Sequence, residues 1–249
     1  MNILYWNVCN AADNQEIVSQ TLEIFKEHDI DVACLQEVPY QTNEDRLSEP
    51  APLSETIANS LGYMSSFQHT RTIRRTPGAI NGYGTAIISR SNIIDLEVHT
   101  LRDDKLTYMT PSPENRRVLM TFRTEEDPEL TIGVAHLSYS LPLKIGEKRK
   151  AEESDELIKI LGKTLIRGKL VFGGDFNSPP GAAVDQKLES IDLVPVSDHE
   201  EPTFRSRHSF AGHVSRNLDR VYVSRGVTAR AEIQDPRQSD HRPIIVSTS

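Results

Sequence analysis

Short apolar runs recur along the chain, each bounded by polar residues, glycines or prolines. These runs predict β-strands at 3–8, 32–36, 85–89, 118–122, 130–136, 170–173, 218–223 and 244–247. Longer segments with apolar residues at helical spacing predict helices at 15–28, 54–61 and 144–166. In the last of these, Leu157, Leu161 and Leu165 fall on one face, which a surface helix would bury against the core.

The order of these elements indicates the class of fold. Helices alternate with strands in both halves, but some neighbouring strands, such as 118–122 and 130–136, are joined only by a loop. That mixture predicts an α/β fold in which two mixed β-sheets pack face to face with helices outside. Neither an internal repeat nor a low-complexity linker interrupts the chain, so a single domain spanning 1–249 is expected.

Composition narrows the classes of protein. No stretch approaches the roughly 18 apolar residues of a membrane span, and the first residues lack the pattern of a secretory signal. A cytoplasmic location without membrane insertion is therefore expected, with Cys9 and Cys34 as reduced thiols. The formal charge of −8 argues against a protein that binds duplex DNA nonspecifically through a positively charged surface. It does not exclude a nucleic-acid substrate.

The stretch VFGGDFNSPP, residues 171–180, places Asp175 and Asn177 two positions apart at the end of a predicted strand. The two glycines before them let the backbone leave the strand, and the two prolines after them prevent its return to the ladder. Functional sites are commonly built on such loops at the edge of a rigid sheet. The structural alternative is an Asx-turn, in which both side chains bond only to nearby backbone.

Other polar side chains share this position at the end of a strand. Taken singly, each has a structural explanation, such as an N-cap or a satisfied buried polar group. Their common context instead predicts one shared site. Its members are Asn7, Glu37, His136, Asp175, Asn177, Asp219, Asp240 and His241.

The carboxylates in this set suit a hard divalent cation. Mg²⁺ is typically held by one or two carboxylates together with water and phosphate oxygens. Glu37 is therefore a natural ligand, with Asp240 or Asn7 beside it. Mn²⁺, which accepts the same kinds of oxygen ligand, is expected to support activity as well.

The remaining side chains suit the attack of water on a phosphoric ester. Asp175 can orient or deprotonate the water, while Asn177 and His136 can donate hydrogen bonds to phosphate oxygens. His241 and Asp219 form an imidazole–carboxylate pair, in which the carboxylate fixes the tautomer and raises the pKa of the imidazole.

Seven short motifs spread over nearly the whole chain carry a family resemblance: YWNV, CLQEV, YGTAIISR, VAHLS, GGDFNSPP, LDRVYVS and SDHRPI. In this order they resemble the endonuclease/exonuclease/phosphatase superfamily, the deoxyribonuclease I-like and exonuclease III-like metal-dependent phosphoesterases. One such motif would be weak evidence, whereas the ordered set is specific. The resemblance implies a four-layer α/β/β/α sandwich, two packed mixed β-sheets flanked by helices, with the site at one edge of the sheets.

The resemblance also implies a role for each site residue. It implies metal binding by Glu37 with Asn7, water activation by Asp175 and Asn177, phosphate contact by His136, and an imidazole–carboxylate pair of His241 and Asp219. Asp240 is implied beside the metal or the leaving group. Arg117 resembles the arginine that reaches the phosphate, for which a guanidinium offers bidentate recognition, and Arg116 is the close alternative.

Some features depart from particular branches of the superfamily. Cys9 stands where many abasic-site endonucleases carry a second carboxylate or carboxamide. Those enzymes also tend to have tryptophan-rich segments late in the chain, whereas the one tryptophan here is Trp6. An abasic-site specialist is therefore disfavoured. The extended motifs of the inositol-phosphatase branch are not found, and a secreted deoxyribonuclease or sphingomyelinase would be expected to carry a signal peptide.

Two basic stretches between the motifs are candidates for substrate binding. The first, 68–84, carries Arg71, Arg74 and Arg75, and the second, 204–216, carries Arg205 and Arg207. Basic side chains interleaved with aromatic ones suit a phosphate backbone with bases stacked nearby. The alternative is that both stretches are only solvated loop surface.

The sequence thus predicts a Mg²⁺-dependent phosphoesterase that cleaves a phosphodiester by attack of water, and it favours a nuclease acting on DNA or RNA. The alternative is a phosphatase or phosphodiesterase acting on an inositol phosphate, a phospholipid or a small nucleotide-like substrate. A catalytically silent binding domain is disfavoured, because a degenerate site would have lost some members of one set, and none is missing: Glu37, Asp175, Asn177, Asp219 and His241. No obligate protein partner is indicated.

Overall fold

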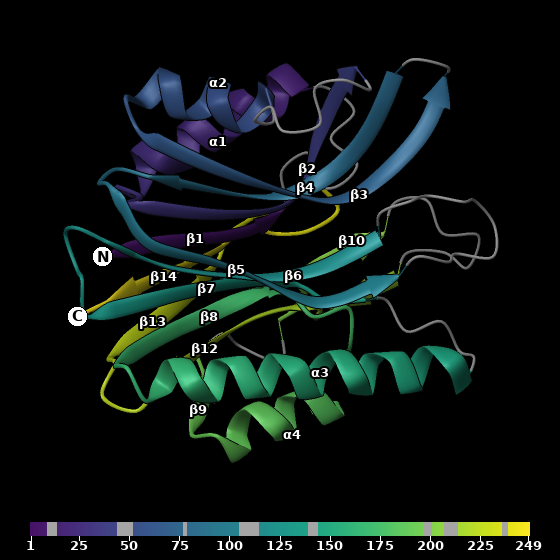
Figure 1. The fold of residues 1–249 in the computed structure, drawn as a ribbon. Helices are drawn as coiled ribbons and strands as arrows, with labels where there is room; N and C mark the ends of the chain where they lie inside the picture. Colours follow the sequence, from purple (N-terminus) through teal and green to yellow (C-terminus); the bar gives the residue numbers. More distant parts are fainter. Residues whose placement is uncertain are drawn as a thin grey trace.

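The computed structural model describes residues 1–8, 14–43, 52–76, 79–104, 115–138, 144–196, 201–206, 214–235 and 239–249. Two six-stranded layers of β-sheet face each other in the described part of the chain, and helices cover the outer face of each (Figure 1). The predicted four-layer α/β/β/α sandwich is confirmed.

The first sheet has the strand order β13-β14-β1-β2-β4-β3. Its strands are β1 (Asn2–Asn7), β2 (Val32–Asn43), β3 (Met64–Thr76), β4 (Ala79–Ser89), β13 (Ala229–Ile233) and β14 (Ile244–Thr248). β1 and β2 run parallel, whereas the other neighbours are antiparallel. Helices α1 (Asn14–Glu27) and α2 (Pro52–Leu61) cover its outer face.

The second sheet has the order β5-β6-β7-β8-β12-β9. Its strands are β5 (Ile93–Asp104), β6 (Asn115–Thr124), β7 (Leu130–His136), β8 (Lys169–Asp175), β9 (Leu193–Pro195) and β12 (Asp219–Ser224). β7 and β8 form its parallel pair. Helices α3 (Lys144–Leu165) and α4 (Ala183–Ser190) cover its outer face. The strands β10 (Phe204–Ser206) and β11 (Val214–Arg216) form a separate two-stranded hairpin.

The two sheets meet at one corner, where the backbone pair of Arg71 and Asn115 is the one that joins β3 to β6 among the described residues. Elsewhere they are held face to face by an apolar core that includes Ile3, Val134 and Val171. Tyr5 of β1 crosses this core, and its hydroxyl donates to the carbonyl of Gly133 in β7 at 3.2 Å. A buried phenol needs such a partner, so Tyr5 ties the two sheets together at their centre.

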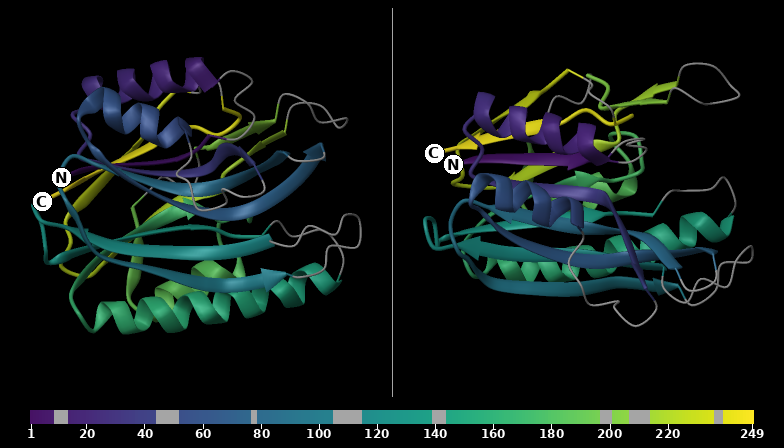
Figure 2. Two further views of the ribbon diagram at one scale, coloured as in Figure 1. Left: turned by 45° about the horizontal axis from the view of Figure 1, so that its top comes forward. Right: turned by 90° about the horizontal axis from the view of Figure 1, so that it is seen from above.

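The two ends of the chain lie beside each other because β1 pairs with β14 (Figure 2). The amide of Thr248 donates to the carbonyl of Met1 at 2.9 Å. Asn7 ends β1 at the opposite end of the same strand. Among the described helices, none combines the length and apolar character needed to cross a membrane.

Gly174 permits the close approach of β8 to β7. Its φ of +139° suits glycine, and a Cβ built there would lie 2.0 Å from the carbonyl oxygen of Ala135. We expect Gly174→Ala to lower the free energy of unfolding by about 2–4 kcal/mol, because the two strands must separate.

Gly162 in α3 is the matched control, since a Cβ there meets nothing within 4 Å. We expect Gly162→Ala to stabilise the protein by about 0.5–1 kcal/mol, the usual gain for alanine inside a helix. Urea denaturation of both variants gives the comparison, and equal stabilities would contradict the close approach at Gly174.

Candidate active site

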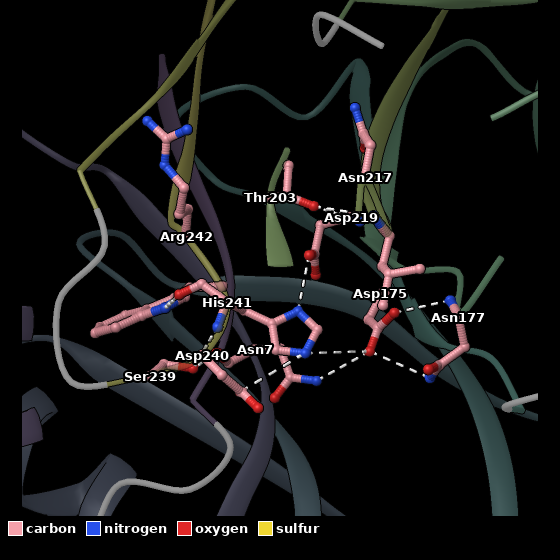
Figure 3. A network of polar contacts seen from close by, with 12 residues as sticks. Asn7, Asp175, Asn177, Thr203, Asn217, Asp219, Ser239, Asp240, His241 and Arg242 are labelled. Carbon is pink, nitrogen blue, oxygen red and sulfur yellow. Dashed lines mark hydrogen bonds and ion pairs between the residues drawn. The ribbon is translucent and has the colours of Figure 1, made fainter. Parts of the chain in front are cut away.

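Six of the residues predicted from the sequence meet at one edge of the paired sheets (Figure 3), namely Asn7, Asp175, Asn177, Asp219, Asp240 and His241. Three predicted residues form a row across the second sheet, because Asp175 of β8 pairs in register with His136 of β7 and with Asp219 of β12. Asn7 reaches this row from the end of β1 in the first sheet. The site is therefore built between the two sheets.

The carboxylate of Asp175 is the centre of this arrangement. Its Oδ1 accepts a hydrogen bond of 2.8 Å from the backbone N–H of Asn177, which is an Asx-turn. Its Oδ2 accepts from the side-chain amides of Asn7 at 3.1 Å and Asn177 at 3.2 Å. The same oxygen lies 3.5 Å from His136 Nε2 and 3.9 Å from His241 Nε2. The turn and the site thus use different oxygens of one carboxylate.

Burial controls the protonation of Asp175, which is only 1% exposed. Desolvation raises its pKa to about 7, and the negative charges of Asp219 and Glu37 act in the same direction. The nearby His241 and the N–H of Asn177 oppose the rise. The result is a carboxyl group whose pKa lies near neutral pH, where a general base is most effective.

Asn177 has a φ of 49°, in the left-handed region that asparagine tolerates better than most residues. Its Nδ2 lies 3.0 Å from the carbonyl of Leu137 and 3.0 Å from His136 Nε2, and it also reaches Asp175. A carbonyl and a carboxylate can only accept hydrogen bonds, so these contacts fix which way the amide faces.

His241 and Asp219 form the expected pair, with 2.8 Å between His241 Nδ1 and Asp219 Oδ2. Burial by itself would lower the pKa of His241. The charge and hydrogen bond of Asp219, together with the charges of Asp175 and Asp240, outweigh burial and raise this pKa to about 10. His241 is therefore a cation at neutral pH, and its Nε2 faces Asp175.

Residues that the motifs did not single out hold this pair in place. Thr203 Oγ1 accepts hydrogen bonds from the amides of Leu218, at 3.0 Å, and Asp219, at 2.9 Å. The indole of Trp6 donates to the carbonyl of His241 at 3.0 Å. Thr203 lies on a distant segment of sequence, so no local pattern could reveal its contact.

Glu37 lies inside β2, which extends to Asn43, rather than at the end of a strand as predicted, and it reaches the site from a distortion in that strand. The pairing of β2 with β4 shifts between Leu35 and Val38, and Glu37 itself has a φ of 52°. A bulge of this kind turns a side chain away from its regular direction in the strand. Glu37 Oε1 lies 3.5 Å from His136 Nε2, and its side chain remains 23% exposed.

The donor set at this edge fits a divalent cation such as Mg²⁺. Glu37, Asn7 and Asp240 offer carboxylate and carboxamide oxygens, which hard cations prefer. The side-chain nitrogen of Asn7 bonds to Asp175, so its oxygen is directed away from that carboxylate. Possible ligand atoms of Asp175, Asp219 and His241 also lie within 4.8 Å of one another, but the hydrogen bond between the last two accounts for their closeness.

The two candidate arginines point in opposite directions from β6. Val118 packs between the sheets, whereas Leu119 packs beneath the outer helices. By alternation, Arg116 shares the face of Val118 and His136. Arg117 shares the face of Leu119, and its charge acts on Glu153 of α3. The structure thus places Arg116, rather than the Arg117 preferred from the sequence, on the face of the site.

The basic stretches are only partly within the described residues. The backbone places Arg71, Arg74 and Arg75 in β3, which is a strand rather than the loop expected. Arg205 is exposed in β10, and its amide donates to the carbonyl of Asp240 at 2.8 Å, which brings the hairpin beside the site. Arg207 and Cys9 lie outside the described residues.

The four-layer fold and its strand-end site are those of a phosphoric ester hydrolase. The chain matches the sequence model of the Endonuclease/Exonuclease/phosphatase family over residues 4–241, and it belongs to that family. Enzymes of this family depend on divalent metal ions. No curated protein sequence matches the chain significantly.

Solved structures agree on the fold. An endonuclease/exonuclease/phosphatase family protein from Leptotrichia buccalis has a TM-score of 0.72 at 16% identity, covering 100% of this chain and 99% of that one. A 3′-5′ exonuclease from Neisseria meningitidis has a TM-score of 0.68 at 18% identity, covering 100% of both chains. A mannosyl-6-phosphatase from Bacteroides thetaiotaomicron has a TM-score of 0.68 at 15% identity, covering 100% and 99%.

The contact between His241 and Asp219 predicts that the two act as a unit. Asp219→Asn should reproduce much of the loss of phosphoric ester hydrolysis seen in His241→Ala, because the imidazole loses the partner that orients and charges it. The double variant should lose less than the two single losses added. Initial rates of the three variants test this, and simple additivity would show that the side chains act independently.

Proposed function

We propose that this protein is a Mg²⁺-dependent phosphodiesterase that attacks its substrate with water. One observation carries the proposal: a single buried oxygen, Asp175 Oδ2, is surrounded by two carboxamides and two imidazoles from both sheets. An oxygen so placed can orient or deprotonate water while the neighbouring donors face the phosphate. Because the site draws residues from both sheets, we further propose that residues 1–249 act as one domain.

The side chains around Asp175 divide the remaining tasks. Asn177 and His136 are the proposed donors to phosphate oxygens, whose negative charge increases as water attacks. The Asn177 amide has two N–H donors and would exchange one of its present contacts for the phosphate. His241, kept protonated by Asp219, directs an N–H toward the same space and neutralises charge on the phosphate or on the leaving oxygen.

Glu37, Asn7 and Asp240 are the proposed ligands of the cation. The chemistry supplied by a bound Mg²⁺ is stabilisation of the charge that develops on the phosphate and the leaving oxygen. Arg116 is the proposed arginine for a phosphate oxygen, since strand alternation places it on the face shared with His136.

We favour a nucleic-acid backbone as the substrate. The Neisseria meningitidis exonuclease resembles this chain over its entire length, and three arginines lie along β3, a strand of the first sheet. A phosphate backbone engages several cations at once, and the sequence of this segment supplies three. Arg205 on the neighbouring hairpin is the proposed contact beyond the site, and the same proposal extends to Arg207.

The first test combines metal dependence with substrate class. Purified protein with Mg²⁺ or Mn²⁺ should cleave single- or double-stranded nucleic acid and bis-p-nitrophenyl phosphate, lose this activity in excess chelator and regain it with added metal. Preference for p-nitrophenyl phosphate, a sugar phosphate or an inositol phosphate would instead indicate a phosphatase. Undiminished turnover in the chelator would refute the role of a metal.

Glu37→Gln separates metal binding from folding. The variant should bind Mg²⁺ more weakly by calorimetry with an unchanged melting temperature, because its side chain is partly exposed at the edge of the sheets. Glu97→Gln is the matched control, since Glu97 is exposed on β5 and pairs with Arg167. Equal Mg²⁺ affinity in the two variants would contradict the assigned ligand.

The two side chains of GGDFNSPP should have separable effects. Asp175→Asn should lower kcat by about 10²–10⁴, the range for loss of a positioned general base, while substrate still binds. Asn177→Ala should cost about 2.7–4 kcal/mol of transition-state stabilisation, as for a lost oxyanion donor. Asp155→Asn, on the exposed face of α3, is the control. If both site variants keep the parental kcat, the segment has only the structural role of an Asx-turn.

A further inference from the structure

Two charged side chains of α3 contact the loops that follow β7 and β8, the strands that end at His136 and Asp175. Lys150 Nζ donates a hydrogen bond of 2.7 Å to the backbone carbonyl of Asn177. One turn along the helix, the carboxylate of Glu153 accepts from the amide of Ser138 through both oxygens, at 3.0 and 3.3 Å. Side chains three apart lie on the same helix face, so one face of α3 holds both loops.

Both charges are removed from water, which costs free energy. Glu153 is buried and Lys150 is partly buried. Burial lowers the pKa of Lys150 to about 8, against the raising effect of Glu153 and Asp175, and burial raises the pKa of Glu153. Charged groups in such surroundings require compensating contacts, and the contacts they make are to backbone beside the site.

The carbonyl that Lys150 holds belongs to a residue in an uncommon backbone conformation. Asn177 has its φ of 49°, and the next carbonyl, that of Ser178, accepts from the guanidinium of Arg220 at 2.6 Å. Arg220 is fully buried and pairs with Asp185 of α4 at 2.9 Å. Two successive carbonyls of this loop are therefore each held by a cation.

We propose that Lys150 is a positioning residue, which holds the Asn177 carbonyl so that the Asn177 amide stays directed at His136 and Asp175. Glu153 supports the same geometry from the other side, because the Ser138 amide follows the Leu137 carbonyl that accepts from Asn177. The proposal rests on the proposed function only in that Asn177 is assigned to the phosphate. Lys150 belongs to α3 in the outer helical layer, whereas Asp175 bonds to Asn7 of the first sheet and His136 shares by alternation the face of Val134, which packs between the sheets.

The kinetic test compares three lysine variants. Lys150→Met keeps the length of the side chain and removes its donor, and we expect kcat to fall about 10–100-fold with KM changed less than about 2-fold, since misplacement of a catalytic group acts mainly on the chemical step. Lys150→Arg restores a cationic donor and should recover most of kcat. Lys159→Met, which removes an exposed pair with Glu156 on the same helix, should match the parent.

A double variant distinguishes positioning from direct contact with substrate. If Lys150 acts through Asn177, adding Lys150→Met to Asn177→Ala should change kcat less than 2-fold beyond Asn177→Ala alone. A raised KM in Lys150→Met, together with full additivity in the double variant, would overturn the proposal and make Lys150 a substrate contact.

A second readout does not require a substrate. The backbone ¹H–¹⁵N resonance of Asn177, whose N–H bonds to Asp175, should shift in metal-free Lys150→Met and return toward the parent position in Lys150→Arg. If the parent hydrolyses no phosphoric ester but the resonance shifts, the positioning holds and the proposed function fails. If the parent is active while both the resonance and kcat are unchanged in Lys150→Met, the positioning fails and the function stands.

Discussion

The burial of one carboxylate governs the rest of the site. Asp175 lies at the end of a strand inside the sandwich, where an ionised group without partners would be very unfavourable. The buried carboxylate is stabilised by hydrogen bonds from Asn7 and Asn177 and by the nearby positive charge of His241. Each of those partners comes from a different strand or loop, so stabilising this group also assembles the residues that surround a substrate phosphate.

The sandwich provides the rigidity that such a site needs. Three strands in register put His136, Asp175 and Asp219 in one row, and the position of that row follows from backbone pairing rather than from side-chain packing. The apolar core between the sheets then holds the first sheet, with Asn7, at a constant distance from the row. Catalytic geometry at this edge is thus a consequence of how two sheets pack.

The outer helical layers cover the sheets, and they also contact the loop of the site. Through Lys150, α3 contacts the backbone of the Asn177 loop, and through Asp185, α4 holds the buried guanidinium of Arg220 that contacts the next residue. Tyr222 adds a hydrogen bond to the same carboxylate at 2.8 Å. A chain of charged contacts therefore runs from the helical layer to the loop of the site, as is usual where a loop must be held in one conformation.

The sequence by itself determined the class of fold and the inner strands, and it predicted the members of the candidate site. β1, β7, β8 and β12 were predictable because strands buried on both faces read as continuous apolar runs. The ordered motifs named the eight strand-end residues because their chemistry is local to each motif. The edge strands β3, β5, β9 and β13, the hairpin of β10 and β11 and the short α4 were missed, since half-exposed or brief elements leave a weak pattern.

Only the tertiary structure decided how those residues are used. It showed that Asp175 makes the Asx-turn with one oxygen and faces the site with the other. It placed Arg116 and Arg117 on opposite faces of β6, which depends on the register of the strand in the sheet. The contacts of Thr203 and Lys150 join segments distant in sequence. Such contacts are created by packing, and packing leaves no local signal in the chain.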